Sequence, residues 1–352
     1  KPIGGCSEAA RSQMSIRVRA PGRVNLIGDH TDYTGGLVFP MAINRWTEIR
    51  GERSQRITLI SEDESGTVEL ATQPTHPHEA SPTWGRYIAE VRNELAHRQK
   101  VGGISGTIST TLPIGAGLSS SASLMVATAI ALGFDGSTVE LAQLARRAEI
   151  AATGVPTGIM DQLCIASATP GHATRIDCND LTIDHVAVPE DINIAVRFIS
   201  HRTLEGSEYS TRVGECSHAE AEIGPLRLAN LADIEEITDL TVRSRARHVI
   251  SENERVTTFA QALASNDYRA AGKIMVESHH SLAHNFDVST PTMNAAVDEL
   301  CQIPGVYGAR MTGGGFGGCV VALCEPGVDI DAWIVSPVGG AQRFDDDTDD
   351  VN

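Results

Sequence analysis

The sequence predicts an α+β fold in two halves with a cleft between them. Segments with strand and helix patterns are mixed along the 352 residues without the regular alternation of a βαβ protein. That length is sufficient for two domains with a large core. Polar, glycine-rich loops follow several of the apolar segments, and binding sites commonly lie where two domains meet.

Strand and helix patterns can be assigned in order along the chain. Short apolar or alternating runs bounded by glycines indicate strands: two within residues 16–50, a hairpin at 57–71, one at 104–112, and the runs ATRIDC, IAVRFIS, VYGARM and CVVALC. Apolar side chains spaced by about 3.6 residues predict helices at 83–98, 122–132 and 137–153, and in RARHVISENERVTTFAQALAS, YRAAGKIMVESHHSL and PTMNAAVDELCQI. Ser137 and Glu140 have the spacing of a capping box.

Composition excludes several classes of function. A net charge of −17 argues against nucleic acid or an anionic membrane as a partner. No apolar run is long enough to span a bilayer, and the first residues, KPIGGCSEAARSQMS, lack the apolar stretch of a signal peptide. Seven cysteines without a C-x-x-C pair indicate free thiols in a reducing compartment. We therefore expect a cytoplasmic protein that binds neither nucleic acid nor membrane. We also expect it to be a monomer.

A serine loop, LPIGAGLSSSAS at residues 112–123, has the features of a phosphate site without the lysine of the usual G-x-x-x-x-G-K-[ST] loop. A predicted strand precedes it and an apolar helix follows, so main-chain N–H groups at the helix N-terminus can bind an anion. Gly115 and Gly117 allow close approach of the backbone. Serine hydroxyls can donate to phosphate, and one can bind Mg²⁺. The alternative is a glycine turn with a serine N-cap, but three consecutive serines exceed what capping requires.

A polar loop, RAPGRVNLIGDHTDYTGG at residues 19–36, contains Arg23, Asp29, His30 and Asp32 within ten residues. Such groups are costly to bury unless they pair or bind a ligand. A solvated turn is the alternative, and it fits poorly because the flanking VNLI and LVFPMAI are apolar. These four side chains are therefore candidates for a binding site.

Two further segments contain candidates for a functional site. In GVPTGIMDQL, residues 154–163, Asp161 stands among apolar residues after a Pro/Gly turn, and capping of the following helix is the simplest interpretation of that residue alone. A glycine loop, RMTGGGFGGC at residues 310–319, links two apolar strands. A flexible hairpin is possible, but glycines in this setting favour a backbone lying against a ligand or another loop.

Taken in this order, the four segments resemble the galactokinase branch of the GHMP family of small-molecule kinases. PGRVNLIGDHTDYTGG is similar to the family's galactose signature, PIGAGLSSSAS to its ATP loop and RMTGGGFGGC to its third motif. Similarity continues in GIMDQ, RIDC, GSEY and RARHV, so that it covers residues 16–325. The resemblance implies a two-domain GHMP kinase fold, with an S5-like N-terminal domain, a ferredoxin-like C-terminal domain and the active site in the cleft.

The resemblance also implies domain limits. We expect an N-terminal GHMP kinase domain at residues 15–180, with the sugar signature and the ATP loop, and a C-terminal domain at 181–340. Residues 1–14 are predicted to be a flexible leader. Residues 341–352, which include FDDDTDDVN, are predicted to be an acidic tail, since such runs are usually solvated and disordered.

By resemblance, Asp161 is the catalytic base and Arg23 its partner. An aspartate beside an arginine stays ionised and can take a proton from an anomeric hydroxyl, while the guanidinium stabilises charge on the phosphoryl group. Ser121 and Glu149 are the implied Mg²⁺ ligands. For Glu149 the alternative is a surface pair with Arg146 or Arg147. The implied ATP-binding residues are Gly115, Ala116, Gly117, Leu118, Ser119, Ser120, Ser121, Trp84 and Tyr87. The two aromatic residues, three apart on a helix, are alternatively core.

The implied sugar-binding residues are Asp29, His30, Asp32, Gly158 and Tyr209. In the family pattern, the residues at Asp32 and Tyr209 contact the axial 4-hydroxyl, which distinguishes galactose from glucose. The signature here has GDH where the family has GEH, so Asp29 is shorter than the glutamate that contacts the 6-hydroxyl. This departure leaves the C6 end of the sugar open. The motif HRTLEGSEY is altered as well.

The resemblance implies ATP-dependent phosphorylation of the anomeric hydroxyl of α-D-galactose to galactose 1-phosphate, the first step of galactose catabolism, with Mg²⁺ as cofactor. Alternative substrates are L-arabinose, galacturonate and N-acetylgalactosamine. A sensor that binds galactose and ATP without turnover is a further alternative. The uninterrupted serine loop, together with Arg23, Glu149 and Asp161, argues against the sensor.

Overall fold

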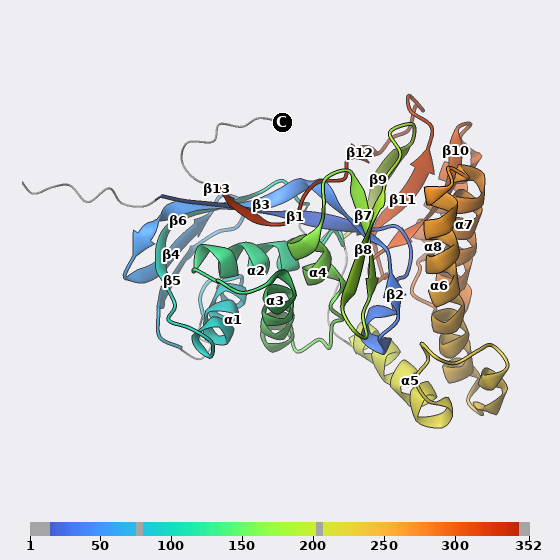
Figure 1. Ribbon diagram of the computed structural model, residues 1–352, viewed down its shortest axis with the longest axis horizontal. Coiled ribbons are helices and arrows are strands. Elements are labelled where there is room, and N and C mark those ends of the chain that lie inside the picture. Colours follow the sequence, from blue (N-terminus) through green and yellow to red (C-terminus); the bar gives the residue numbers. More distant parts are fainter. Residues whose placement is uncertain (1–14, 75–79, 114, 202–206, 345–352) are drawn as a thin grey trace, which may run out of the picture.

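A computed structural model describes residues 15–74, 80–113, 115–201 and 207–344. The predicted leader at 1–14 and residues 345–352 of the predicted acidic tail lie outside the described residues. The molecule is elongated, with sheet and helices at one end, a second sheet and long helices at the other, and a small sheet between them (Figure 1). This agrees with the predicted division into two halves.

The first half is a six-stranded sheet in the order β13-β1-β3-β6-β4-β5, with four helices on one face (Figure 1). Its strands are β1 (Ser15–Asn25), β3 (Pro40–Ser54), β4 (Arg56–Ser61), β5 (Thr67–Ala71), β6 (Gly103–Thr110) and β13 (Gln342–Phe344). Its helices are α1 (Gly85–Ala96), α2 (Ser120–Ala131), α3 (Thr138–Thr153) and α4 (Met160–Ser167). The predicted hairpin at 57–71 is confirmed as β4 and β5, which pair antiparallel.

Local sequence signals explain the helix bounds in this half. The capping box is confirmed, because Ser137 accepts from the N–H of Glu140 and the Glu140 side chain accepts from the N–H of Ser137. Gly154 ends α3 with a φ of 73°, a left-handed conformation that glycine adopts without strain. Helix α2 is largely buried, as its apolar sequence predicts.

The second half is built on an antiparallel sheet in the order β10-β11-β9-β12, with α6, α7 and α8 beside it (Figure 1). Its strands are β9 (Asn193–Ser200), β10 (Val306–Thr312), β11 (Gly318–Cys324) and β12 (Trp333–Val335). Its helices are α5 (Ser207–Ile223), α6 (Leu240–Ala264), α7 (Tyr268–His284) and α8 (Pro291–Gln302). A short 3-10 turn, η3 (Asp233–Glu236), also belongs to this half, and another, η1 (Asp32–Thr34), belongs to the first half. The small central sheet contains β2 (Leu37–Val38), β7 (His172–Asp177) and β8 (Thr182–Ala187).

Two boundaries differ from the sequence expectation. The predicted limit at residue 180 falls inside the hairpin of β7 and β8, whose strands pair along their whole length. The predicted acidic tail begins too early, because Gln342–Phe344 form β13, the edge strand of the six-stranded sheet, and pair with β1. The ring of Phe344 lies 5.4 Å from the Arg17 guanidinium, so packing as well as pairing holds this strand.

A shared core joins the two halves. Val24 and Phe39 from the first half belong to the same buried cluster as Met275 and Val321 from the second. Separate clusters fill each half behind its own sheet. The polar loop and the serine loop flank this junction, so the shared core holds them in a fixed relation.

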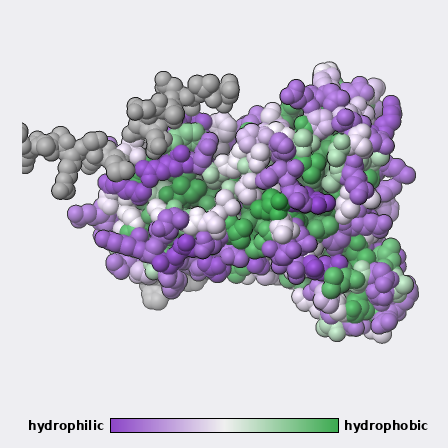
Figure 2. Space-filling view, viewed as in Figure 1, coloured by the Kyte–Doolittle hydropathy of each residue, from purple (hydrophilic) through white to green (hydrophobic). Residues whose placement is uncertain are grey.

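The visible face is mostly hydrophilic, with apolar patches between the two halves and on the lobe that holds α5 (Figure 2). Three exposed leucines, Leu228, Leu231 and Leu240, lie in the segment between α5 and the start of α6. In the described residues, no helix combines the length and the apolar character that a membrane crossing requires.

Helix α7 and strand β10 meet at two glycines, and this contact gives a stability prediction. A Cβ on Gly272 would lie 2.1 Å from the carbonyl oxygen of Tyr307. We expect Gly272→Ala to lower the free energy of unfolding by about 1–3 kcal/mol, since α7 must move away from the sheet. Gly214 in α5 is the control, because nothing lies within 4 Å of its would-be Cβ. Gly214→Ala should stabilise by about 0.5–1 kcal/mol. Urea unfolding measures both, and equal stability of Gly272→Ala and the unmodified protein would contradict the packing argument.

Candidate active site

A cleft of about 620 Å³ lies where the polar loop, the serine loop and the start of α4 meet. This volume is within the range of small-molecule sites. The predicted site residues line it, with the exception of Ala116 and Leu118. The side chains of those two residues are buried in the shared core instead, and the carbonyl oxygen of Leu118 accepts from the N–H of Arg23 at 3.2 Å.

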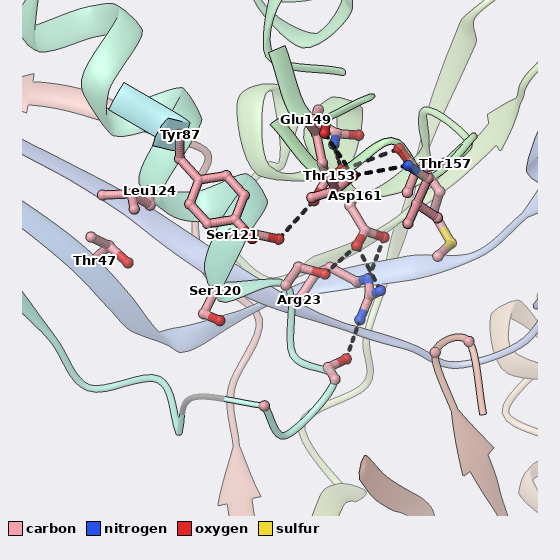
Figure 3. A pocket seen from close by; sticks show the side chains of 18 of the residues that line it. Arg23, Thr47, Tyr87, Ser120, Ser121, Leu124, Glu149, Thr153, Thr157 and Asp161 are labelled. Carbon is pink, nitrogen blue, oxygen red and sulfur yellow. Dashed lines mark hydrogen bonds and ion pairs between the residues drawn. The ribbon is translucent and has the colours of Figure 1, made fainter. Parts of the chain in front are cut away.

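Arg23 on β1 and Asp161 on α4 form a two-pronged ion pair on the wall of the cleft (Figure 3). Arg23 Nε donates to Asp161 Oδ1 at 2.7 Å and Nη2 donates to Oδ2 at 2.8 Å. The remaining nitrogen, Nη1, donates to the carbonyl oxygen of Gly117 at 2.8 Å. Burial opposes the charge of Arg23, but the charge and hydrogen bonds of Asp161 raise its pKa above the ordinary value. Asp161 is therefore directed at Arg23, and helix capping does not explain it.

Two serines of the serine loop, Ser119 and Ser121, have different partners. Gly115, Gly117 and Ser119 have φ values of 74°, 75° and 62°, so the loop coils in the left-handed region before α2 begins at Ser120. The Ser119 hydroxyl donates to Asp161 Oδ2. The Ser121 hydroxyl donates to Glu149 Oε1 at 2.7 Å (Figure 3). Ser119 thus faces the carboxylate of Asp161, whereas the sequence assigned it only to phosphate.

Glu149 points into the cleft from α3. Its side chain is buried, and burial raises its pKa above the ordinary value. Oε2 accepts from Gln162 Nε2 at 2.6 Å and from Thr157 Oγ1 at 3.3 Å. Arg146 and Arg147 bind elsewhere, to the carbonyl oxygen of Thr157 and to Glu94. The surface pair considered from the sequence is therefore wrong.

Asp32 and Gly158 form the floor beside the Arg23–Asp161 pair. A Cβ on Gly158 would lie 1.7 Å from Asp32 Oδ2, so the Asp32 carboxylate occupies the space that any other side chain would need. Burial, and next the charge of Asp161, raise the pKa of Asp32 to about 6. His30 has a φ of 66°, and its ring lies 5.5 Å from the ring of Tyr209.

Asp29 is held by the glycine loop. Its Oδ1 accepts from the N–H of Gly313 at 3.1 Å, and its Oδ2 lies 2.7 Å from Arg310 Nη2. Only 2 % of the Asp29 side chain is exposed. The expectation that the glycine loop lies against another loop is thus met at Asp29. The sequence analysis gave Arg310 no role, although an arginine inside an apolar strand is a signal of a buried ion pair.

Trp84 and Tyr87 line the far end of the cleft, at the start of α1, and also pack against the core of the first half. Trp84 Nε1 donates to the carbonyl oxygen of Ser65 at 3.2 Å. The cleft has further lining residues that the sequence analysis did not single out: Thr47, Ser61, Asp63, Glu64, Arg86, Thr110, Leu124 and Thr153. These residues are polar, charged or apolar and lie in separate segments, so no motif or spacing marks them in the sequence.

Three family models match this chain. They are the galactokinase galactose-binding signature at residues 8–51, the GHMP kinase N-terminal domain at 86–169 and the GHMP kinase C-terminal domain at 259–332. The chain is 39% identical over 333 residues to galactokinase from Canis lupus familiaris, covering 89% of this chain and 85% of the relative. It is also 39% identical over 322 residues to galactokinase from Thermotoga maritima, covering 89% and 90%. The chain belongs to the galactokinase family.

Solved structures agree with this membership. The structure of Lactococcus lactis galactokinase complexed with galactose has a TM-score of 0.87 to this chain at 27% identity, covering 94% of this chain and 95% of the other. A mevalonate kinase has a TM-score of 0.67 at 19% identity, covering 92% and 99%, which shows the shared fold alone. The predicted GHMP kinase fold is confirmed, and this member of the galactokinase family is a kinase.

Within the described ranges, no group of three or more His, Cys, Asp or Glu side chains has the arrangement to hold a metal ion. The pair of Ser121 and Glu149 is a different kind of candidate. A hydroxyl and a carboxylate are the hard oxygen ligands that Mg²⁺ prefers, and nucleotide phosphates complete such a shell.

The raised pKa of Asp32 predicts a pH dependence of stability. The folded protein keeps a proton on Asp32 up to about pH 6, whereas the unfolded chain releases it near the ordinary value of 3.8. The contribution of Asp32 to stability is therefore fully present below about pH 4 and is lost as pH rises to about 6, by on the order of 3 kcal/mol. Urea unfolding of the ligand-free protein across this range should show a larger loss for the unmodified protein than for Asp32→Asn, in which the raised pKa of Glu149 still contributes. Parallel curves for the two proteins would contradict the prediction.

Proposed function

We propose that this kinase transfers the terminal phosphoryl group of ATP to the anomeric hydroxyl of α-D-galactose, giving galactose 1-phosphate in the first step of galactose catabolism. One observation carries the proposal. The Arg23–Asp161 pair lies on the wall of a cleft that is lined on one side by the polar loop and on the other by the serine loop. Relatives named galactokinase and a relative solved with galactose support the choice of sugar.

Asp161 is the proposed base. Its carboxylate takes the proton of the anomeric hydroxyl while the sugar oxygen forms a bond to the terminal phosphorus. The bond between that phosphorus and its bridging oxygen breaks, and ADP leaves. Arg23 holds the Asp161 carboxylate in place through two hydrogen bonds, so the orientation of the base is fixed. The same guanidinium is positioned to stabilise the charge that develops on the phosphoryl group.

ATP is proposed to bind along the serine loop, with its base near Trp84 and Tyr87. The N–H groups of residues 115–121 and the N-terminus of α2 supply the positive field that a lysine supplies in other nucleotide loops. Ser121 and Glu149 would hold Mg²⁺. When bound, the ion neutralises phosphate charge. The close contact of their oxygens at 2.7 Å supports this assignment.

The sugar is proposed to lie among Asp29, His30, Asp32, Gly158 and Tyr209, with Asp32 and Tyr209 on the axial 4-hydroxyl. Gly158 leaves room for the carboxylate of Asp32, which supports its role as an acceptor. We also propose that the enzyme is a cytoplasmic monomer. The six cysteines in the described residues are free thiols, which supports a reducing compartment.

Replacement of the proposed base gives a direct test. Asp161→Asn keeps the shape and one oxygen acceptor for Arg23 but cannot take a proton, so kcat should fall by about 10²–10⁴-fold. The measurement is galactose-dependent release of ADP, with circular dichroism to show that the fold is retained. Asp298→Asn, on the exposed surface of α8, is the matched control and should keep full activity. A folded Asp161→Asn enzyme with normal turnover would exclude Asp161 as the base.

A sugar panel tests the substrate. We expect galactose to exceed glucose, galacturonate, N-acetylgalactosamine, L-arabinose and 6-deoxygalactose in kcat/KM. The last two lack the 6-hydroxyl, and Asp29 has lone pairs left to accept it directly or through water. An acceptor without its hydroxyl costs about 1–3 kcal/mol, which corresponds to a loss of roughly 5- to 150-fold in kcat/KM. Equal use of galactose, 6-deoxygalactose and L-arabinose would show that Asp29 does not read C6, and turnover of none of these sugars would overturn the proposed function.

A further inference from the structure

A cluster of buried charges lies behind the polar loop, away from the catalytic pair. Arg310 on β10 and Glu252 on α6 are both 0 % exposed, and they lie 3.6 Å apart at Arg310 Nη2 and Glu252 Oε1. The same guanidinium nitrogen lies 2.7 Å from Asp29 Oδ2. Buried ion pairs contribute little net stability, because removing each charge from water costs about as much as the pair returns. The cluster therefore calls for an explanation other than stability.

Glu252 binds the main chain of the polar loop directly. Its Oε1 accepts from the N–H of Gly28 at 3.0 Å and from Ser278 Oγ at 2.6 Å, and its Oε2 accepts from Arg255 Nε at 2.7 Å. Gly28 has a φ of 90°, and a Cβ there would lie 2.7 Å from Val256 Cγ2 on the same helix. The polar loop is therefore in close contact with α6. Helix α6 also lies beside β2, which follows that loop (Figure 1).

The next residue of the loop is held from three sides. His248 Nε2 lies 3.1 Å from the carbonyl oxygen of Asp29, and its Nδ1 lies 2.9 Å from Ser281 Oγ. A carbonyl oxygen only accepts, so Nε2 carries the proton. Burial lowers the pKa of His248 to about 4, which keeps the ring neutral with Nδ1 as an acceptor. With Arg310 and the N–H of Gly313 on its carboxylate, Asp29 has no freedom to turn.

A series of contacts therefore connects Glu252 to the proposed sugar site. Glu252 remains ionised although burial opposes its charge, since the guanidinium groups of Arg255 and Arg310 lower its pKa to about 2. Its charge holds Arg310, Arg310 holds the Asp29 carboxylate, and its Oε1 holds Gly28, the residue before Asp29. We propose that Glu252 is a positioning residue of the sugar site, which orients Asp29 and His30 from the second half of the molecule without touching the sugar. This inference rests on the proposed sugar-binding role of those two residues.

The test compares sugar binding with nucleotide use in two variants. Glu252→Ala removes both acceptors, and the dissociation constant of galactose, measured by calorimetry without nucleotide, should rise at least tenfold. Glu252→Gln keeps an oxygen for the N–H of Gly28 but loses the charge that holds Arg310, so an intermediate rise of a few fold is expected. The KM for ATP should stay within about twofold in both variants, because Glu252 lies outside the serine loop. If Glu252 had a purely structural role, its replacement would instead weaken the binding of galactose and ATP together, or the binding of neither.

Glu254→Gln is the matched control, since Glu254 is exposed on the same helix and should bind galactose as the unmodified protein does. If Glu252→Ala does not fold, the comparison of Glu252→Gln with Glu254→Gln decides the matter. Equal galactose affinity in those two proteins, or an equal loss for galactose and ATP in either Glu252 variant, overturns the inference and leaves the proposed function intact. Failure of the unmodified protein to bind galactose overturns both.

Discussion

Arg23 and Asp161 meet through two hydrogen bonds, and their contact connects three parts of the site. Arg23 comes from β1, Asp161 from the first turn of α4, and the third prong of the guanidinium binds the carbonyl oxygen of Gly117 in the serine loop. A planar fork with fixed geometry sets both the distance and the orientation of the carboxylate. Only 4 % of the Arg23 side chain is exposed. A buried guanidinium needs a partner for its charge and its N–H groups, so the carboxylate has little freedom to move away from it.

An acidic protein that handles an anion needs a local positive field. This chain has a net charge of −17 and no lysine in its serine loop. Sources among the described residues are the main-chain N–H groups of a loop coiled in the left-handed region, the N-terminus of α2, and the guanidinium groups of Arg23 and Arg86, which line the cleft. Such a field depends on backbone geometry more than on side-chain charge, and two glycines with positive φ provide that geometry.

The second constraint on the site is that segments of the backbone must approach their neighbours closely. Gly158 makes room for the Asp32 carboxylate, and Gly28 lets the polar loop lie against α6. In both places a methyl group would occupy the position of a carboxylate or a helix side chain. The cleft therefore combines a rigid wall, set by buried ion pairs, with glycines that let that wall approach a small ligand.

The sequence by itself determined the loops that matter and the local structure around them. Ser137, Glu140 and Gly154 mark the ends of α3, because capping and left-handed termination depend on neighbouring residues only. The four polar segments and the family they resemble were also recognisable, since their residue order lies within short stretches.

Only the tertiary structure decided which side chains meet. Arg23 and Asp161 are 138 positions apart. Asp29 in the polar loop and Glu252 on α6 meet at Arg310 on β10. The placement of β13 beside β1 and the turning of Ser119 toward Asp161 are likewise long-range contacts. Packing of distant segments selects such partners, and no local periodicity or propensity encodes that choice.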